Sequence, residues 1–195
     1  MRLFVALDID DAIRKRISLF QDGVVGFASD AKWVRAESLH VTLKFIGEVS
    51  SEMLEQIRTA LSQVSVSPFT LTLHGIGFFP TANAPRVFWI GIEAGPDLAA
   101  LAGRVDAALE KLNIAKEVHA YQPHLTLARG PRASGAPRWK SSDHPNLTFS
   151  RLQEKLRQIP TPEFGTMTAR EFFLYQSKVQ RGGAVYTKIA RFELV

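Results

Sequence analysis

Two short segments of the chain share one pattern of histidine and threonine. They are residues 39–45 (LHVTLKF) and residues 123–129 (PHLTLAR). Each predicts a β-strand in which the histidine and threonine share one face, because side chains alternate between the two faces of a strand. The two histidines are 84 positions apart (124 minus 40), so only the fold could bring them into one site.

A facing pair of such strands would suit a small anion. A residue and its second neighbour stand about 6.6 Å apart along a strand, so the histidine and threonine of one copy can reach opposite sides of one polyatomic group. Together the copies offer the imidazoles of His40 and His124 and the hydroxyls of Thr42 and Thr126. These four groups fit a phosphate. A lone strand histidine is more often a structural residue, but two copies in the same phase favour a shared site.

The order of the expected elements indicates the fold class. Apolar residues at helical spacing predict helices that are capped by Asp10 or Asp11, by Ser50 or Ser51 and by Asp97, and one further helix that contains Phe149. Expected strands occupy residues 1–8, 39–48, 69–79, 86–93, 123–129, 170–176 and 184–194. Many neighbouring strands look antiparallel. We therefore expect an α+β fold in which residues 1–195 form one two-lobed domain. Each lobe is a mainly antiparallel sheet with outer helices, and one His-x-Thr strand from each lobe lines a central cleft.

Composition excludes several classes of protein. The chain has no cysteine, which excludes a disulfide scaffold, a thiolate zinc site and a cysteine nucleophile. The sequence contains no signal-peptide pattern and no long apolar run, so we expect a cytoplasmic protein without a membrane segment. The net charge is +5, and residues 129–157 hold seven basic and two acidic side chains, which also sum to +5. This basic segment is either a solvated surface or a surface that receives a polyanion.

The motifs and their surroundings resemble the two-histidine phosphoesterase superfamily. Within it, the closest resemblance is to the RNA 2′,3′-cyclic phosphodiesterases, formerly called 2′-5′ RNA ligases. The resemblance is carried by residues 33–35, 39–49, 85–89, 123–129 and 172–186, and so spans nearly the whole chain. The departures are Ile46, where leucine is commoner, and the basic loop at 130–145, which has no counterpart that we can match.

The resemblance implies a reaction and its two proton-transfer groups. The implied substrate is RNA with a 2′,3′-cyclic phosphate end, or a cyclic nucleotide, and the implied product is the 2′-phosphomonoester. No metal or other cofactor is expected, and a monomer is expected. The family's assignment makes His40 the general acid that protonates O3′ and His124 the general base that activates water. The residues themselves fit either assignment, since an unperturbed imidazole titrates near ~6.5 and can serve in both roles.

Four further residues are candidates for substrate binding, and a fifth lies beside one of them. Thr42 and Thr126 would donate hydrogen bonds to the non-bridging phosphate oxygens. The resemblance also implies that Arg129 contacts the phosphate and that Phe45 stacks on the nucleobase. Simple strand alternation opposes both, because it places Arg129 and Phe45 on the core side. It also places Lys44 on the face of His40, where we expect a solvated lysine.

Two alternative functions remain open at this stage. The chain could be a binding module that holds RNA ends or nucleotides without turnover, or an enzyme whose main activity is 2′-5′ RNA ligation. Retention of both histidines and both threonines argues against the binding module, since binding alone requires no pair of proton-transfer groups. A metal hydrolase is disfavoured, because the histidines lack His-x-x-x-His spacing and nearby carboxylates.

Overall fold

The computed structural model describes residues 1–131, 147–180 and 183–195. Its elements follow this order along the chain: β1 (Arg2–Leu7), α1 (Asp11–Val24), η1 (Val25–Ala28), β2 (Lys32–Trp33), η2 (Ala36–Ser38), β3 (Val41–Glu48), α2 (Ser51–Ser62), β4 (Phe69–Phe79), β5 (Val87–Glu93), α3 (Asp97–Glu110), β6 (His124–Arg129), η3 (Leu147–Phe149), α4 (Ser150–Leu156), β7 (Glu163–Ala169), β8 (Glu171–Gln180) and β9 (Gly183–Glu193). Most of the predicted loop at 130–145 and part of the predicted turn at 181–183 lie outside the described residues.

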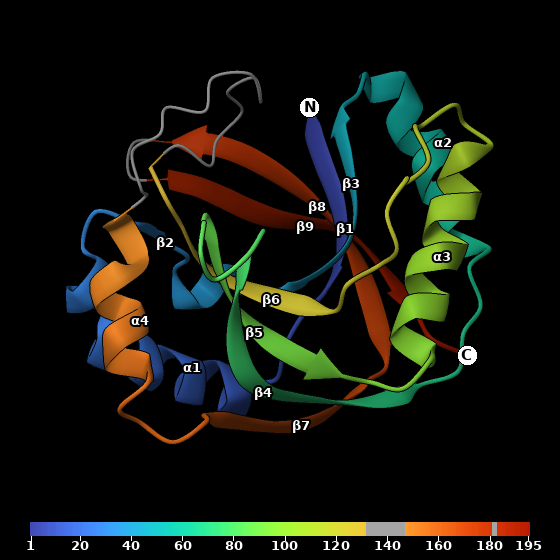
Figure 1. Ribbon diagram of the computed structural model, residues 1–195. Coiled ribbons are helices and arrows are strands. Elements are labelled where there is room, and N and C mark those ends of the chain that lie inside the picture. Colours follow the sequence, from blue (N-terminus) through green and yellow to red (C-terminus); the bar gives the residue numbers. More distant parts are fainter. Residues whose placement is uncertain (132–146, 181–182) are drawn as a thin grey trace.

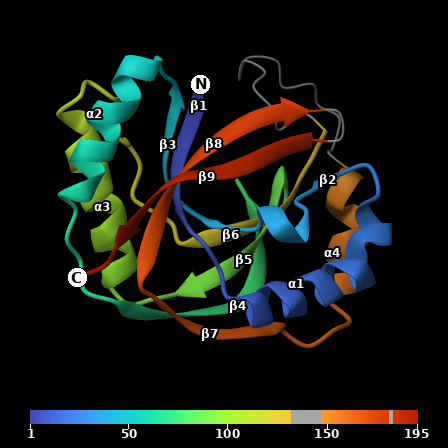
Figure 2. The same cartoon turned by 180° about the vertical axis from the view of Figure 1, so that it is seen from behind.

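The strands form two sheets, which confirms the expected α+β class. The first sheet has the order β3-β1-β8-β9 and the second the order β2-β6-β5-β4-β7. Every neighbouring pair of strands in these sheets is antiparallel. Helices α2 and α3 lie together on one side of the molecule, and α1 and α4 lie on the opposite side (Figure 1; Figure 2 gives the reverse view). No helix of the described segments is long and apolar enough to cross a membrane.

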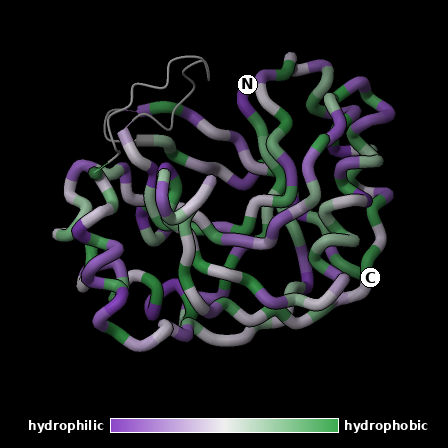
Figure 3. The backbone as a smooth tube through the Cα atoms, in the orientation of Figure 1, coloured by the Kyte–Doolittle hydropathy of each residue, from purple (hydrophilic) through white to green (hydrophobic). Residues whose placement is uncertain are grey.

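Strand β1 shows how the core is divided. Its residues from Leu3 to Leu7 are all buried, and the strand is mostly green, hydrophobic, next to the N-terminus in Figure 3. Because side chains alternate, Leu3 and Val5 join the main core, whereas Phe4 and Ala6 face the other way. There they pack in a smaller cluster with Phe173 and Tyr175. This second face of the first sheet is the one that carries His40, whose ring lies 4.8 Å from that of Phe4.

The predicted helix starts agree with the structure in part. The hydroxyl of Ser50 accepts a hydrogen bond from the backbone N–H of Met53 at 3.3 Å, so Ser50 is the cap of α2. Helix α1 begins after Asp10, although no side-chain hydrogen bond caps it. The prediction that Asp97 caps α3 is wrong, because Asp97 is its first helical residue and Pro96 precedes it.

Two strands escaped the sequence-based prediction. Strand β2 is only Lys32–Trp33, too short to show a period. In β7 the buried residues Phe164 and Met167 are three positions apart, because a register shift near Gly165 breaks the pairing with β4. An interrupted alternation of this kind is not recognisable as a strand from apolar spacing alone. Helix α4 ends at Leu156 and is shorter than the apolar spacing indicates.

Candidate active site

The two His-x-Thr segments belong to different sheets. His40 immediately precedes β3, an edge strand of the first sheet, and His124 is the first residue of β6 in the second sheet. The positive charge of Arg129 acts on both imidazoles, since it lowers the pKa of His40 and the pKa of His124. One guanidinium therefore lies within electrostatic reach of both rings.

Each imidazole is held by the same local hydrogen bond. Nδ1 of His40 is 2.7 Å from the carbonyl oxygen of Ser38, and Nδ1 of His124 is 2.7 Å from the carbonyl oxygen of Gln122. A carbonyl oxygen can only accept, so Nδ1 of each ring carries a proton and donates it. The neutral form of each ring therefore presents the lone pair of Nε2, the atom that can take up or release a proton.

Aromatic side chains pack against both rings, and burial lowers the proton affinity of each ring. Tyr186 lies edge-on to His40 with ring centroids 5.2 Å apart, and Phe79 lies edge-on to His124 at 4.9 Å. Burial is the largest cause that lowers the pKa of His40, to about 4, and it also lowers the pKa of His124. The charge of Arg129 acts in the same direction, and the carbonyl hydrogen bonds partly oppose both effects.

A β-bulge interrupts each motif strand at the same position. In β3, Thr42 pairs with Ala6 and Lys44 pairs with Val5, which leaves Leu43 as an extra residue. In β6 the register shifts in the same way: residue 126 pairs with 89 and residue 128 with 88, so that residue 127 is extra. Each bulge therefore lies three positions after the motif histidine and reverses the alternation of the residues that follow.

The bulges correct three predictions that rested on simple alternation. Phe45 was placed in the core by alternation, but its side chain is 61% exposed. Arg129 was likewise placed on the core side, but it is exposed. Lys44 was expected to be solvated, but it is 5% exposed and its ammonium lies 2.5 Å from the carboxylate of Asp106. The fifth residue after each histidine thus returns to the face that carries the histidine and threonine.

A partly buried arginine, whose role the sequence did not reveal, supports His40. The guanidinium of Arg14, in α1, donates to the carbonyl oxygens of Ala36 and Leu39, at 2.5 Å and 3.3 Å, and forms an ion pair with Asp8. It therefore holds the turn that leads directly into His40. Helical spacing places Arg14 beside the apolar stripe of α1, and nothing in the sequence distinguishes it from a surface arginine.

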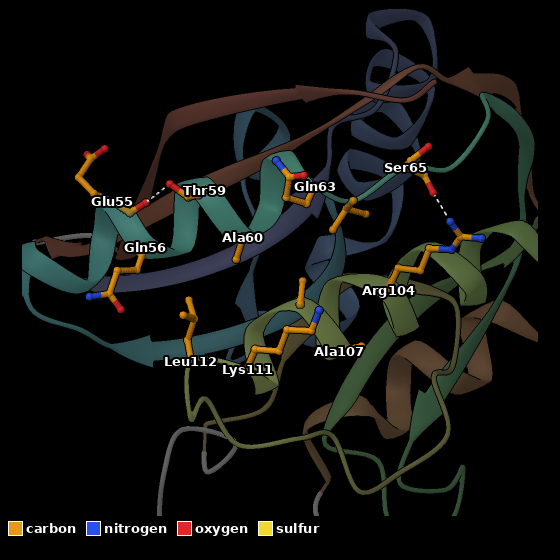
Figure 4. A pocket seen from close by; sticks show the side chains of 12 residues that line it. Glu55, Gln56, Thr59, Ala60, Gln63, Ser65, Arg104, Ala107, Lys111 and Leu112 are labelled. Atoms are coloured by element: carbon orange, nitrogen blue, oxygen red, sulfur yellow. Dashed lines mark hydrogen bonds between the residues drawn. The ribbon is translucent and has the colours of Figure 1, made fainter.

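Of two hollows in the described part of the chain, the smaller is lined by His40 and the larger lies apart from both motif strands. The smaller, about 350 Å³, adjoins His40 and includes Tyr175, Tyr186 and Lys188. The larger, about 740 Å³, lies between α2 and α3, and Figure 4 shows that its side chains come from both helices. It contains no histidine and neither motif strand contributes to it. In the described segments, no cluster of three or more metal-ligating side chains is found.

The family to which this chain is similar is matched twice, once around each motif. The model of the LigT like phosphoesterase family matches residues 7–89 and again residues 90–186, one match for each His-x-Thr. The RNA 2′,3′-cyclic phosphodiesterase of Archaeoglobus fulgidus is 35% identical over 193 residues, 99% of this chain and 100% of that protein. The protein of the same name from Escherichia coli is 30% identical and covers 99% of this chain and 96% of its own length.

Solved structures share this fold over nearly the full chain. TT0787 of Thermus thermophilus superposes with a TM-score of 0.76 at 30% identity, covering 100% of this chain and 98% of its own. Escherichia coli LigT complexed with 3′-AMP also superposes with a TM-score of 0.76, at 27% identity, covering 99% of this chain and 97% of its own.

Proposed function

Because this chain belongs to the LigT like phosphoesterase family, we propose that it hydrolyses 2′,3′-cyclic phosphate ends of RNA, or cyclic nucleotides, to 2′-phosphomonoesters. The observation that carries the proposal is the matched pair of imidazoles. Nδ1 of His40 and of His124 is tied to a backbone carbonyl, and the charge of Arg129 reaches both rings. The names of the related proteins support the same substrate class.

The two histidines supply the proton transfers of an in-line displacement. Nε2 of His124 takes a proton from water, and the water oxygen attacks phosphorus. The bond from phosphorus to O3′ breaks, and Nε2 of His40 gives its proton to O3′, which leaves a free 3′-hydroxyl and a 2′-phosphate. His124 ends protonated and His40 neutral, and exchange with solvent restores the starting states. No cofactor takes part in these steps.

Three further side chains stabilise the phosphate. The hydroxyls of Thr42 and Thr126 share the faces of His40 and His124 and donate to the non-bridging oxygens as charge accumulates there. Arg129, brought to this face by the bulge in β6, adds a charge-assisted hydrogen bond.

The lowered pKa values of the two imidazoles imply that His40, the general acid, gains its proton only when the substrate binds. With the pKa of His40 near 4 and that of His124 below its usual value, both rings of the free enzyme are mainly neutral at pH 7. A bound phosphate diester carries one negative charge, which raises the pKa of an adjacent imidazole. His40 therefore acquires its proton together with the substrate.

A direct test is the product formed from a 2′,3′-cyclic mononucleotide, identified by phosphorus NMR with and without EDTA. We expect the 2′-monoester at equal rates in both conditions. Failure to consume the substrate while still binding it would favour the non-catalytic binding module. Addition of an RNA with a free 5′-hydroxyl tests the other alternative, since preferential formation of a 2′-5′ bond would identify ligation as the main activity. A rate abolished by EDTA and restored by metal would contradict the proposed chemistry.

Phe45 is expected to bind the nucleobase. Its ring is 61% exposed on the face of Thr42, and stacking of a base on an aromatic ring contributes about 1–3 kcal/mol. Phe45→Ala should therefore raise KM for a cyclic nucleotide about 10-fold while kcat changes little. Phe45→Trp should retain a low KM. Leu19→Ala removes a side chain that is 68% exposed on α1 and serves as the matched control. Equal KM values for Phe45→Ala and the control would exclude stacking.

The remaining parts of the proposal concern assembly and location. Because one chain provides both histidines, we propose that residues 1–195 act as a single two-lobed domain and as a monomer. The absence of cysteine is compatible with the cytoplasm, where we place the enzyme. Light scattering during gel filtration tests the monomer, and a stable dimer would contradict it.

A further inference from the structure

The proposed reaction requires a fixed separation between two strands that no backbone ladder joins. β3 and β6 belong to different sheets, so pairing between strands does not set the distance from His40 to His124. The in-line displacement is sensitive to that distance, because both proton transfers depend on it and a misplacement of about 1 Å can lower a rate by about 10²-fold. Other contacts must therefore hold the two motifs in place.

The segment that leads into each motif forms a hydrogen bond to the strand of the other motif. Before His40, the backbone N–H of Val34 donates to the carbonyl oxygen of Leu127 in β6 at 2.8 Å. Before His124, the hydroxyl of Tyr121 donates to the carbonyl oxygen of Thr42 in β3 at 2.9 Å. The hydrogen bond of Val34 extends the backbone pairing of β2 with β6, whereas the hydrogen bond of Tyr121 depends on one side chain.

The position of Tyr121 suits it to this role. β3 is an edge strand, so its outer side has no neighbouring strand in the first sheet to satisfy its carbonyl groups. The phenol hydroxyl satisfies that of Thr42, the residue whose side chain is proposed to hold the phosphate. Tyr121 is only three residues from His124. Burial raises the pKa of Tyr121, so the hydroxyl remains a donor throughout the working pH range.

The ion pair between Lys44 and Asp106 fixes the segment before Tyr121 to β3. Because the bulge turns Lys44 inward, its ammonium donates to the carbonyl oxygen of Ala115 at 2.6 Å and to Asp106 at 2.5 Å. The two carboxylate oxygens of Asp106 also accept from the backbone N–H of Glu117, at 3.2 and 3.3 Å. The stretch between α3 and β6 is thus fixed to β3 before Tyr121 is reached.

We propose that Tyr121 is a positioning residue that sets the separation of the two histidines through its hydrogen bond to the Thr42 carbonyl, with the Lys44–Asp106 pair as its support. This inference rests on the proposed function, because it concerns the geometry of that reaction. Tyr121 does not touch the substrate in this scheme. Its loss should therefore affect the chemical step and leave substrate affinity largely intact.

Tyr121→Phe removes the hydroxyl and keeps the ring. We expect kcat for a 2′,3′-cyclic nucleotide to fall about 10-fold or more, with KM changed less than about twofold. In a His124→Ala background the same substitution should cause little further loss, because the pair whose spacing it sets is already incomplete. Thr72→Val is the control, since it removes the hydrogen bond between Thr72 and Thr166 that joins β4 to β7.

The outcomes separate the inference from the function on which it rests. Wild-type protein that leaves the cyclic nucleotide intact contradicts the proposed function itself. If the wild type is active and folded Tyr121→Phe has an unchanged kcat, only the positioning role is overturned. The positioning role is also overturned if Tyr121→Phe lowers kcat in the His124→Ala background by the same factor as in the wild type. If Tyr121→Phe does not fold, Asp106→Asn provides the second variant. It weakens the Lys44–Asp106 ion pair and should lower kcat more than it changes KM, and an unchanged kcat there also overturns the inference.

Discussion

His124→Ala and His40→Ala should each lower hydrolysis of a 2′,3′-cyclic nucleotide by about 10²- to 10⁴-fold, the usual contribution of a general acid or base. Each substitution removes one Nε2 and leaves the backbone carbonyl that held Nδ1 without that donor. The side chains proposed to bind the phosphate, Thr42, Thr126 and Arg129, are left in place, so product binding should persist. Initial rates with purified variants, together with a titration of the 2′-monoester product, measure both quantities.

The two roles can be distinguished with a substrate in which sulfur replaces O3′. A thiolate leaves without a proton, so the general acid is no longer needed. His40→Ala should then recover most of its activity, whereas His124→Ala should remain impaired because water must still be deprotonated. The opposite pattern would exchange the assigned roles. Recovery of neither variant would contradict proton donation by a histidine.

His74→Ala is the matched control for both substitutions. His74 lies in β4, where its Nε2 is 3.3 Å from the carboxylate of Glu93, and β5 separates β4 from the motif strand β6. Activity should stay within about twofold of wild type, since exposed substitutions usually change stability by less than about 0.5 kcal/mol. A comparable loss in His74→Ala and in His40→Ala would mean that the assay reports folding instead of catalysis.

The two sheets and the candidate site were predictable from the sequence to different degrees. Alternation in residues 39–45 and 123–129 is strict enough to pair each histidine with its threonine, and helical spacing located α1, α2 and α3 closely. The order of strands in each sheet was not predictable, because it depends on contacts between residues far apart in the chain. The same holds for Arg14, whose partners near residues 36–39 become neighbours only in the fold.

The bulges explain why Phe45 and Arg129 were misplaced by alternation. In both strands the extra residue is a leucine, Leu43 or Leu127, at a position where regular alternation also expects an apolar residue. The only sign of the bulge in the sequence of β6 is that a second apolar residue, Ala128, directly follows Leu127. In β3 the corresponding residue is Lys44, whose charge conceals its burial until its partner, Asp106, is known. The exposure of Phe45 and of Arg129 is compatible with the contacts that the resemblance implies, whereas local alternation placed both in the core.

Arg129→Gln should lower kcat/KM by about 10²-fold, comparable to the loss of one donor from a site that stabilises developing negative charge. It should also change the pH dependence. Since the charge of Arg129 lowers the pKa of both His40 and His124, its removal raises both pKa values. In Arg129→Lys the charge is kept but the planar fork is lost, so kcat/KM should fall with little change in the pH profile.

The sign of the pH effect follows from the free enzyme, whose pKa values determine kcat/KM. Catalysis needs one protonated and one neutral imidazole, so kcat/KM is largest between the two pKa values. With that of His40 near 4 and that of His124 lowered, the wild-type maximum should lie below pH 6.5 and the rate should fall as the pH rises past it. Profiles between about pH 4 and 8 should show the Arg129→Gln maximum at higher pH, although still acidic, because burial remains the largest cause at both rings. An unshifted maximum in Arg129→Gln would contradict the claim that one guanidinium acts on both histidines.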